Sequence, residues 1–203
     1  MIKNYIFDFG NVLVHFDPDY LTSVYVKEEE DKKLVSQVAF DRLYWDKLDA
    51  GTISDEEVKK EVCKRLPQRL HEAACKVYDN WVMNLEQIDG MAEIVTELKT
   101  RGAKLYLISN ISKKFAAEYA LAPKVNSVLS RFDGLVFSAP LGMTKPHADI
   151  FRYLLEKYEI KAEETMFIDD SAVNVEGGEK VGIKGYLFDG DAKRLKVALE
   201  VQE

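Results

Sequence analysis

The sequence predicts an α/β protein with a doubly wound parallel sheet and a helical subdomain inserted into it. Short apolar runs alternate with helix-like segments along the second half of the chain, which favours a parallel sheet covered by helices on both faces. A long stretch between the first two apolar runs has a helical pattern throughout and is too long for a loop. With 203 residues, 47% of them hydrophobic, the chain can bury one core and a subdomain.

The strands of the core are expected at the apolar runs Lys3–Phe9, Lys104–Ser109, Leu135–Ser138, Met166–Asp169 and Gly185–Phe188. Between them, Met91–Lys99 places its apolar residues on one helical face, and Gly102 is suited to end that helix. A similar stripe runs from Ile150 to Tyr158. We interpret both stripes as faces that pack on the core.

The inserted stretch is expected to form a helical cap over residues 16–85, and residues 1–15 and 86–203 to form the α/β core. Asp17 precedes Pro18 as an N-cap residue would, and Ser54–Glu57 matches a capping box. No Pro/Gly/Ser-rich linker separates the two parts. The cap is therefore expected to pack closely on the core.

Composition and charge exclude several classes of function. A formal net charge of −7 disfavours a broad basic surface for nucleic acid. The N-terminus lacks the features of a secretory signal and no segment suits a membrane span, so a cytoplasmic protein is expected. Cys63 and Cys75 form no CxxC pair and have no clustered His beside them, which favours reduced, structural thiols over a zinc site.

Polar residues follow the predicted strands at their carboxyl ends, where open α/β sheets bind ligands. Asp8 ends the first strand and is followed by a Gly10-Asn11 turn. Ser109 and Asn110 end the second strand and offer a hydroxyl, an amide and backbone N–H groups to phosphate oxygens. Each has an ordinary alternative: Asp8 could cap a turn, and Ser109-Asn110 could be a plain strand exit.

Two later segments add a cation and a pair of acids. Lys145 precedes Pro146, which biases the lysine toward an extended conformation at a helix entrance, although a solvated surface lysine is the commoner case. Asp169 and Asp170 end an apolar strand as adjacent carboxylates, which repel one another and favour a bound cation over a simple helix cap. Oxygen ligands without nearby Cys or His indicate Mg²⁺ rather than zinc.

These strand-end motifs, FDFGNVL, ISN, Lys145 and IDDSAVN, resemble in order the motifs of the haloacid dehalogenase (HAD) superfamily, over nearly the whole chain. The helical insertion is similar to that family's helical cap of the first type. The DxGNV pattern resembles a subgroup similar to bacterial glucose-1-phosphate phosphatases. The resemblance implies a Mg²⁺-dependent phosphatase that hydrolyses a small phosphorylated metabolite, with a sugar phosphate favoured.

The resemblance also implies roles for the strand-end residues. Asp8 would attack phosphorus to form an aspartyl-phosphate that water later hydrolyses. Mg²⁺ would be held by Asp8, the backbone carbonyl of Gly10 and Asp170, with Asp169 a direct or outer partner.

The remaining motif residues would bind the phosphoryl group. Ser109, Asn110 and Lys145 would hold the transferred phosphoryl group, and Lys145 would oppose its charge in the transition state. Asn174 would support the metal loop.

The sequence departs from the family at Gly10, where most phosphatases carry a second Asp as general acid. His15 and Asp17 lie just downstream as substitutes, although surface and capping roles are more typical of them. Without an acid, good leaving groups would be favoured. Two other functions stay open on the same fold: a metal-independent hydrolytic dehalogenase, and a catalytically silent member that binds a ligand or partner.

The substrate is the least predictable feature, and the oligomeric state is equally open. The cap carries aromatic residues that could face a sugar or nucleotide, although packing between helices is the more typical role. These are Tyr20, Tyr44, Trp45, Tyr78 and Trp81.

Overall fold

The computed structural model describes residues 1–200 and contains the predicted parallel sheet. Its strands are β1 (Asn4–Phe7), β4 (Lys104–Ser109), β5 (Gly134–Phe137), β6 (Thr165–Asp169) and β7 (Lys184–Leu187). They lie in the order β5-β4-β1-β6-β7, and each neighbouring pair is parallel. The predicted fold class is confirmed, with small shifts at the strand ends.

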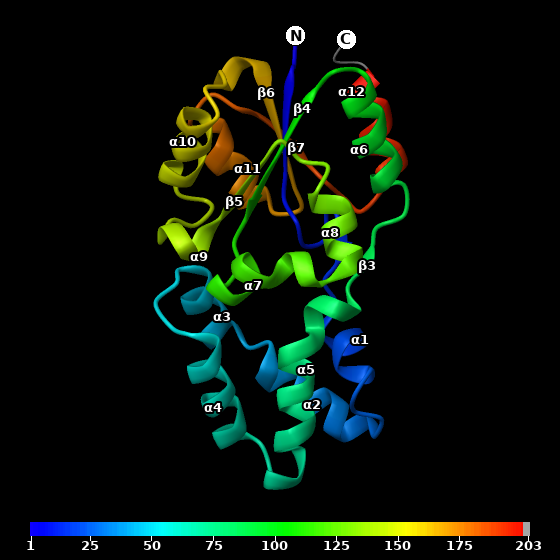
Figure 1. Cartoon of the computed structure of the whole chain (residues 1–203), viewed down its shortest axis with the longest axis vertical. Helices are drawn as coiled ribbons and strands as arrows, with labels where there is room; N and C mark the ends of the chain where they lie inside the picture. The colour runs from blue at the N-terminus through cyan, green and yellow to red at the C-terminus, as the bar shows by residue number, and fades with distance from the viewer. Residues whose placement is uncertain (201–203) are drawn as a thin grey trace.

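Helices cover both faces of the sheet, and successive strand residues point to opposite faces, so both sides of each strand are buried. Tyr5 and Phe7 of β1 enter one core cluster, whereas Ile6 between them enters another. The first cluster packs against α6 (Met91–Thr100) and α12 (Ala192–Glu200), and the second against α10 (Ala148–Lys157). Figure 1 shows these helices on opposite sides of the sheet.

The two predicted apolar stripes are core faces. In α6 the buried residues are Met91, Ile94, Val95 and Leu98, and Gly102 follows the helix with a φ of +84°. The remaining helices of the core are α7 (Lys113–Glu118), α8 (Pro123–Leu129), α9 (Ser138–Leu141) and α11 (Ala172–Glu179), with short 3-10 turns at Tyr119–Leu121 and Ala162–Glu164.

The insertion between β1 and β4 is helical. It contains α1 (Pro18–Ser23), α2 (Glu29–Ala39), α3 (Arg42–Asp49), α4 (Asp55–Arg65) and α5 (His71–Asn80), with 3-10 turns at Gln68–Leu70 and Trp81–Asn84. Asp17 caps α1, and Ser54 and Glu57 form the predicted capping box. A separate cluster including Val35, Val58 and Val77 lies inside it. Figure 1 shows these helices beyond the end of the sheet opposite the termini.

A short ribbon not predicted from the sequence joins the insertion to the core. β2 (Val14–His15) and β3 (Glu86–Gln87) pair antiparallel, so the two connections to the core run side by side. The backbone N–H of Ile88 also donates to the carbonyl of Leu13 at 3.1 Å. The boundaries of the cap at residues 16 and 85 stay a prediction. Within residues 1–200 no helix is long and apolar enough to cross a bilayer.

One glycine sets how closely α11 approaches the segment around Lys145. A Cβ added at Gly177 would lie 2.4 Å from the carbonyl oxygen of Pro146, so only glycine fits there without backbone movement. A Cβ added at the neighbouring Gly178 would instead meet the edge of the Phe167 ring at 3.1 Å, and a ring can shift.

Gly177→Ala is therefore expected to destabilise the protein, by about 1–3 kcal/mol, because the methyl group overpacks a backbone contact. Gly-to-Ala changes inside helices ordinarily stabilise, by about 0.5–1 kcal/mol, so the sign is diagnostic. Urea unfolding curves measure the change in the free energy of unfolding. Gly178→Ala is the matched control and should lose less stability than Gly177→Ala. A Gly177→Ala protein as stable as wild type would contradict the close approach.

Candidate active site

The strand order creates a crevice at the carboxyl ends of β1 and β6. The chain proceeds from β1 outward to β4 and β5, and then returns to the other side of β1 to form β6 and β7. Ligands of open α/β sheets bind at such a switch point. Asp8 follows β1 and Asp169 ends β6, and the backbone N–H of Asp8 donates to the carbonyl of Ile168 at 2.9 Å. The two carboxylates thus share one edge of the sheet.

The ammonium of Lys145 lies between these two carboxylates. Its Nζ is 2.7 Å from Asp8 Oδ1 and 2.7 Å from Asp169 Oδ2. The lysine side chain is 1% exposed, and that of Asp169 is fully buried. Burial works to lower the pKa of Lys145, but Asp8 and Asp169 outweigh it and the pKa is raised. Lys145 therefore stays charged and can oppose an anion beside Asp8.

Asp169 is held by donors on every side. Its Oδ1 accepts from the backbone N–H of Ser171 at 2.8 Å and from Nδ2 of Asn174 at 3.1 Å, while Oδ2 accepts from Lys145. A carboxylate so engaged is suited to fix Lys145 and Asn174 in place. Its direct binding to a metal stays a prediction.

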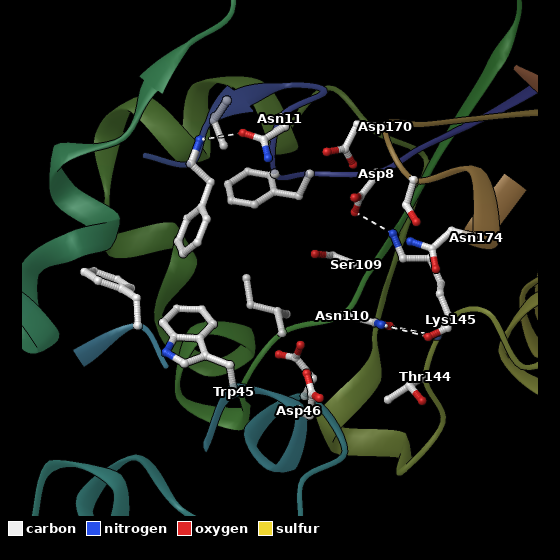
Figure 2. Close-up of a pocket in the computed structure, with 18 of the residues that line it drawn as sticks. Asp8, Asn11, Trp45, Asp46, Ser109, Asn110, Thr144, Lys145, Asp170 and Asn174 are labelled. Carbon is white, nitrogen blue, oxygen red and sulfur yellow. Dashed lines mark hydrogen bonds and ion pairs between the residues drawn. The ribbon is translucent and has the colours of Figure 1, made fainter. Parts of the chain in front are cut away.

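Asn110 fixes the main chain of Lys145. Its Nδ2 donates to the carbonyl of Lys145 at 3.0 Å, and its Oδ1 accepts from the backbone N–H of Lys145 at 2.8 Å. Both ends of the amide are therefore engaged, and Asn110 is placed to position the lysine. Ser109 is 3% exposed and lines the same cavity as Asp8. Figure 2 shows the ion pair between Asp8 and the end of Lys145, with Ser109 beside it.

The turn after Asp8 is held by Asn11, which adopts a φ of +55°. Its Oδ1 accepts from the backbone N–H of Phe16 at 3.1 Å, and its side chain also hydrogen-bonds Asp170. Gly10 itself does not have a positive φ, and a Cβ added there would meet the Cβ of Phe16 at an ordinary 3.7 Å. This position therefore has room for a larger residue.

The acids at this edge carry more negative charge than Lys145 balances. Asp8, Asp169 and Asp170 each offer a carboxylate oxygen, and these oxygens all lie within 4.8 Å of one another. Burial, opposed by Lys145 and reinforced by Asp169, raises the pKa of Asp8 to about 7. Burial and Asp169 also raise the pKa of Asp170. Excess charge on hard oxygen ligands fits a Mg²⁺ ion, and the ligand set of Asp8, Asp170 and the Gly10 carbonyl stays a prediction.

These residues form one end of a cavity of about 810 Å³ that lies between the sheet and the helical insertion. Its polar end is lined by Asp8, Gly10, Ser109, Asn110, Lys145, Asp170 and Asn174. Its other walls are aromatic and charged, and are lined by Phe16, Phe40, Trp45, Trp81, Arg42, Asp46, Asp49 and Thr144. Figure 2 shows Trp45 and Asp46 across the cavity from Asp170 and Asp8.

Sequence reasoning missed most of the residues that the insertion contributes. Arg42, Trp45, Asp46 and Asp49 follow the spacing i, i+3, i+4, i+7 along α3, which marks one helical face. A helical face that combines an aromatic residue with charged residues at this spacing is unsuited to core packing. This pattern in the sequence could have identified the cavity-lining residues of α3. Of the aromatic residues singled out in the sequence, Trp45 and Trp81 line the cavity.

The other candidates lie elsewhere. Tyr44 and Tyr78 are buried in the core of the insertion, and Tyr20 is exposed. His15 is exposed on β2, and Asp17 accepts from the backbone of α1; neither lines the cavity. The thiols of Cys63 and Cys75 lie 3.8 Å apart within the insertion, away from the cavity.

A model of the haloacid dehalogenase-like hydrolase family matches residues 2–182, a range that includes every strand-end residue described above. The chain belongs to this family. The prediction of a hydrolase on the HAD fold is thereby confirmed. The matched segment also contains the whole helical insertion.

Relatives and solved structures match this HAD hydrolase over almost its full length. A D-ribitol-5-phosphate phosphatase of Bacteroides thetaiotaomicron is 26% identical and covers 92% of this chain and 91% of its own. A sesquiterpene phosphatase of Aspergillus oryzae is 26% identical over 90% of this chain and 88% of its own. A HAD family enzyme of B. thetaiotaomicron, crystallised with magnesium and inorganic phosphate, superposes with a TM-score of 0.68 at 21% identity, covering 96% and 99%.

The raised pKa of Asp8 predicts how metal-free protein responds to pH. The folded state holds a proton on Asp8 up to pH about 7, whereas the unfolded state releases it near the ordinary aspartate pKa of 3.8. Between these values the folded state binds more protons, so the contribution of Asp8 to stability falls as pH rises. Asp8→Asn should then raise the melting temperature in chelator above pH 7, with a gain that shrinks toward pH 4. A gain independent of pH would contradict the raised pKa.

Proposed function

We propose that this chain is a Mg²⁺-dependent phosphatase that hydrolyses a small phosphorylated metabolite through an aspartyl-phosphate on Asp8. The carrying observation is the arrangement of Asp8 with Lys145 and two further acids at the switch point of the sheet. Two phosphatase relatives that align over nearly the whole chain support the proposal. A structure of the same fold crystallised with magnesium and phosphate supports the cofactor.

Each residue of the site has a role in the first step. The Asp8 carboxylate attacks phosphorus while the bond to the leaving oxygen breaks. Lys145 lies 2.7 Å from Asp8 and opposes the charge on the transferred oxygens, with Ser109 beside it. A bound Mg²⁺ would neutralise part of the charge shared by the phosphate and the acids, held by Asp8, the carbonyl of Gly10 and Asp170.

The same charges distinguish phosphate transfer from dehalogenation. In a metal-free dehalogenase Asp169 would still hold Lys145 and Asn174, but the further charge of Asp170 beside Asp8 would have no evident use. The pKa of Asp170 is raised by burial and by Asp169, and these outweigh the opposing effects of Asn11 and Lys145. A metal ion bound by oxygen ligands accounts for this cost.

The substrate class follows from the other end of the cavity. The ring centroids of Trp45 and Trp81 lie 5.5 Å apart, and those of Phe16 and Trp45 lie 5.3 Å apart. The wall of the cavity therefore offers aromatic rings to a ligand. Arg42 and Asp46 add hydrogen-bonding groups. Aromatic faces beside such groups are suited to a sugar or polyol, and the ribitol phosphate relative agrees with that class.

The insertion over residues 16–85 would act as a HAD cap of the first type. This role is supported by the position of the insertion between β1 and β4 and by the residues that it contributes to the cavity walls. The DxGNV pattern would place the chain in the subgroup similar to glucose-1-phosphate phosphatases. Cap closure would exclude water during the first step.

Asp8→Asn should abolish turnover while the protein stays folded, because the amide is not a nucleophile. Asp170→Ala should inactivate the enzyme mainly because it weakens Mg²⁺ binding. A higher Mg²⁺ concentration should therefore restore part of the activity of Asp170→Ala, but none of the activity of Asp8→Asn. Hydrolysis of p-nitrophenyl phosphate with and without chelator measures both, with circular dichroism as the folding control. Ordinary activity in Asp8→Asn would exclude the covalent mechanism.

Trp45→Ala should raise KM for sugar and polyol phosphates by roughly tenfold, with a smaller effect on kcat, because it removes one face of the binding wall. Leu43→Ala is the matched control, since Leu43 lies on the same helix but is 56% exposed and outside the cavity lining. Steady-state kinetics with a panel of phosphate esters measures the effect. Equal KM values for both variants would argue against substrate contact with this wall.

A further inference from the structure

A phosphatase of this kind needs a proton donor for its leaving group, and the usual position holds Gly10. The sequence candidates His15 and Asp17 do not line the cavity. Asp17 is in addition committed to α1, because its Oδ1 accepts from the backbone N–H groups of Asp19 and Tyr20. The donor must therefore come from another part of the cavity wall.

Asp49, the last residue of α3, lines the cavity with only 8% of its surface exposed. Burial raises its pKa to about 7, with Arg42 lowering it and Asp46 raising it. Lys145 also lowers its pKa and Asp8 raises it, so both charges lie within electrostatic range of Asp49. A carboxyl in these surroundings keeps its proton near neutral pH and can give it up.

The end of α3 is fixed against the core. Lys113 of α7 donates to the carbonyl of Gly51 at 2.9 Å. Gly51 has a φ of +69°, and a Cβ added there would lie 2.3 Å from the carbonyl oxygen of Ala139 in α9. The segment after Asp49 therefore lies directly on α9, so the end of α3 that carries Asp49 into the cavity lining is held against the core.

The other ionisable groups that line the cavity are unsuited to donate a proton. Lys145 is held by two carboxylates, and Asp8 and Asp170 are the nucleophile and the proposed metal ligand. Arg42 does not release its proton near neutral pH. Asp46 has a side chain that is 72% exposed and paired with Arg42 at 3.4 Å.

We propose that Asp49 is the general acid that protonates the leaving-group oxygen, in place of the acid absent at Gly10. This inference rests on the proposed phosphatase function. As Asp8 bonds to phosphorus and the P–O bond to the leaving group breaks, the Asp49 proton passes to that oxygen and an alcohol departs. The Asp49 carboxylate then accepts a proton from water as the water oxygen bonds to phosphorus and the Asp8–phosphorus bond breaks, which restores both residues.

The test measures single-turnover rates with Mg²⁺ for phosphate monoesters that range from p-nitrophenyl phosphate to alkyl and sugar-alcohol phosphates. For Asp49→Asn, rates with p-nitrophenyl phosphate should stay close to wild type, because that leaving group needs no proton. Rates with alkyl phosphates should fall by about 100-fold or more. His15→Gln changes an exposed residue outside the cavity lining and should keep the wild-type dependence on the leaving group.

A second variant separates proton donation from a structural role. Gly10→Asp places a carboxyl at the usual position, where its Cβ has room. The double variant Gly10→Asp/Asp49→Asn should hydrolyse alkyl phosphates at least tenfold faster than Asp49→Asn alone. A purely structural defect would not allow this gain. Equal slowing of all esters by Asp49→Asn, or no rescue, would overturn the proposal.

The wild-type protein gives an independent readout that does not depend on any variant folding. Above the Asp49 pKa of about 7 the rate with alkyl phosphates should fall, while the rate with p-nitrophenyl phosphate should not. The same pH response for both esters would overturn the proposal. A wild-type protein that hydrolyses neither ester with Mg²⁺ would instead reject the phosphatase function itself, so the two failures are distinguishable.

Discussion

The ammonium of Lys145, shared between Asp8 and Asp169 at 2.7 Å from each, is the interaction on which the site depends. A buried cation is stable only when its partners are fixed, because breaking one contact leaves an uncompensated charge. The surrounding structure supplies this fixing at both ends of the lysine. Asn110 holds its main chain through two hydrogen bonds, and Asp169 is in turn held by Asn174 and the backbone of Ser171.

The balance of charge around this lysine links the fold to the chemistry. Parallel strands bring the acids to one edge of the sheet, where partial burial and the neighbouring charge of Asp169 raise the pKa of Asp8 and Asp170. The excess negative charge of this site lowers the stability of the metal-free protein. The same charge makes the site suited to bind a cation and an electrophilic phosphorus. Part of the stability of the fold is in this way given up at the place where ligands bind.

The strand-end residues were predictable because two simple rules place them: buried strands read as apolar runs, and parallel strands end at one edge. Asp8, Ser109 and Asp169 follow from these rules. The pairing of Asn110 with Lys145 could not be predicted, since it joins residues 35 positions apart whose register depends on packing. The place of Asp49 in the cavity lining could not be predicted for a different reason: periodicity shows which residues share a face of α3, but not what that face packs against.

The two tryptophans of the chain, Trp45 and Trp81, both line the cavity and lie 5.5 Å apart. Indole emission responds to the polarity of its surroundings, so the whole tryptophan fluorescence of this protein originates at the wall of this cavity. The molecule thus carries an intrinsic optical probe of ligand entry and of the hydration of that wall, and no label is needed to follow either on the timescale of a stopped-flow experiment.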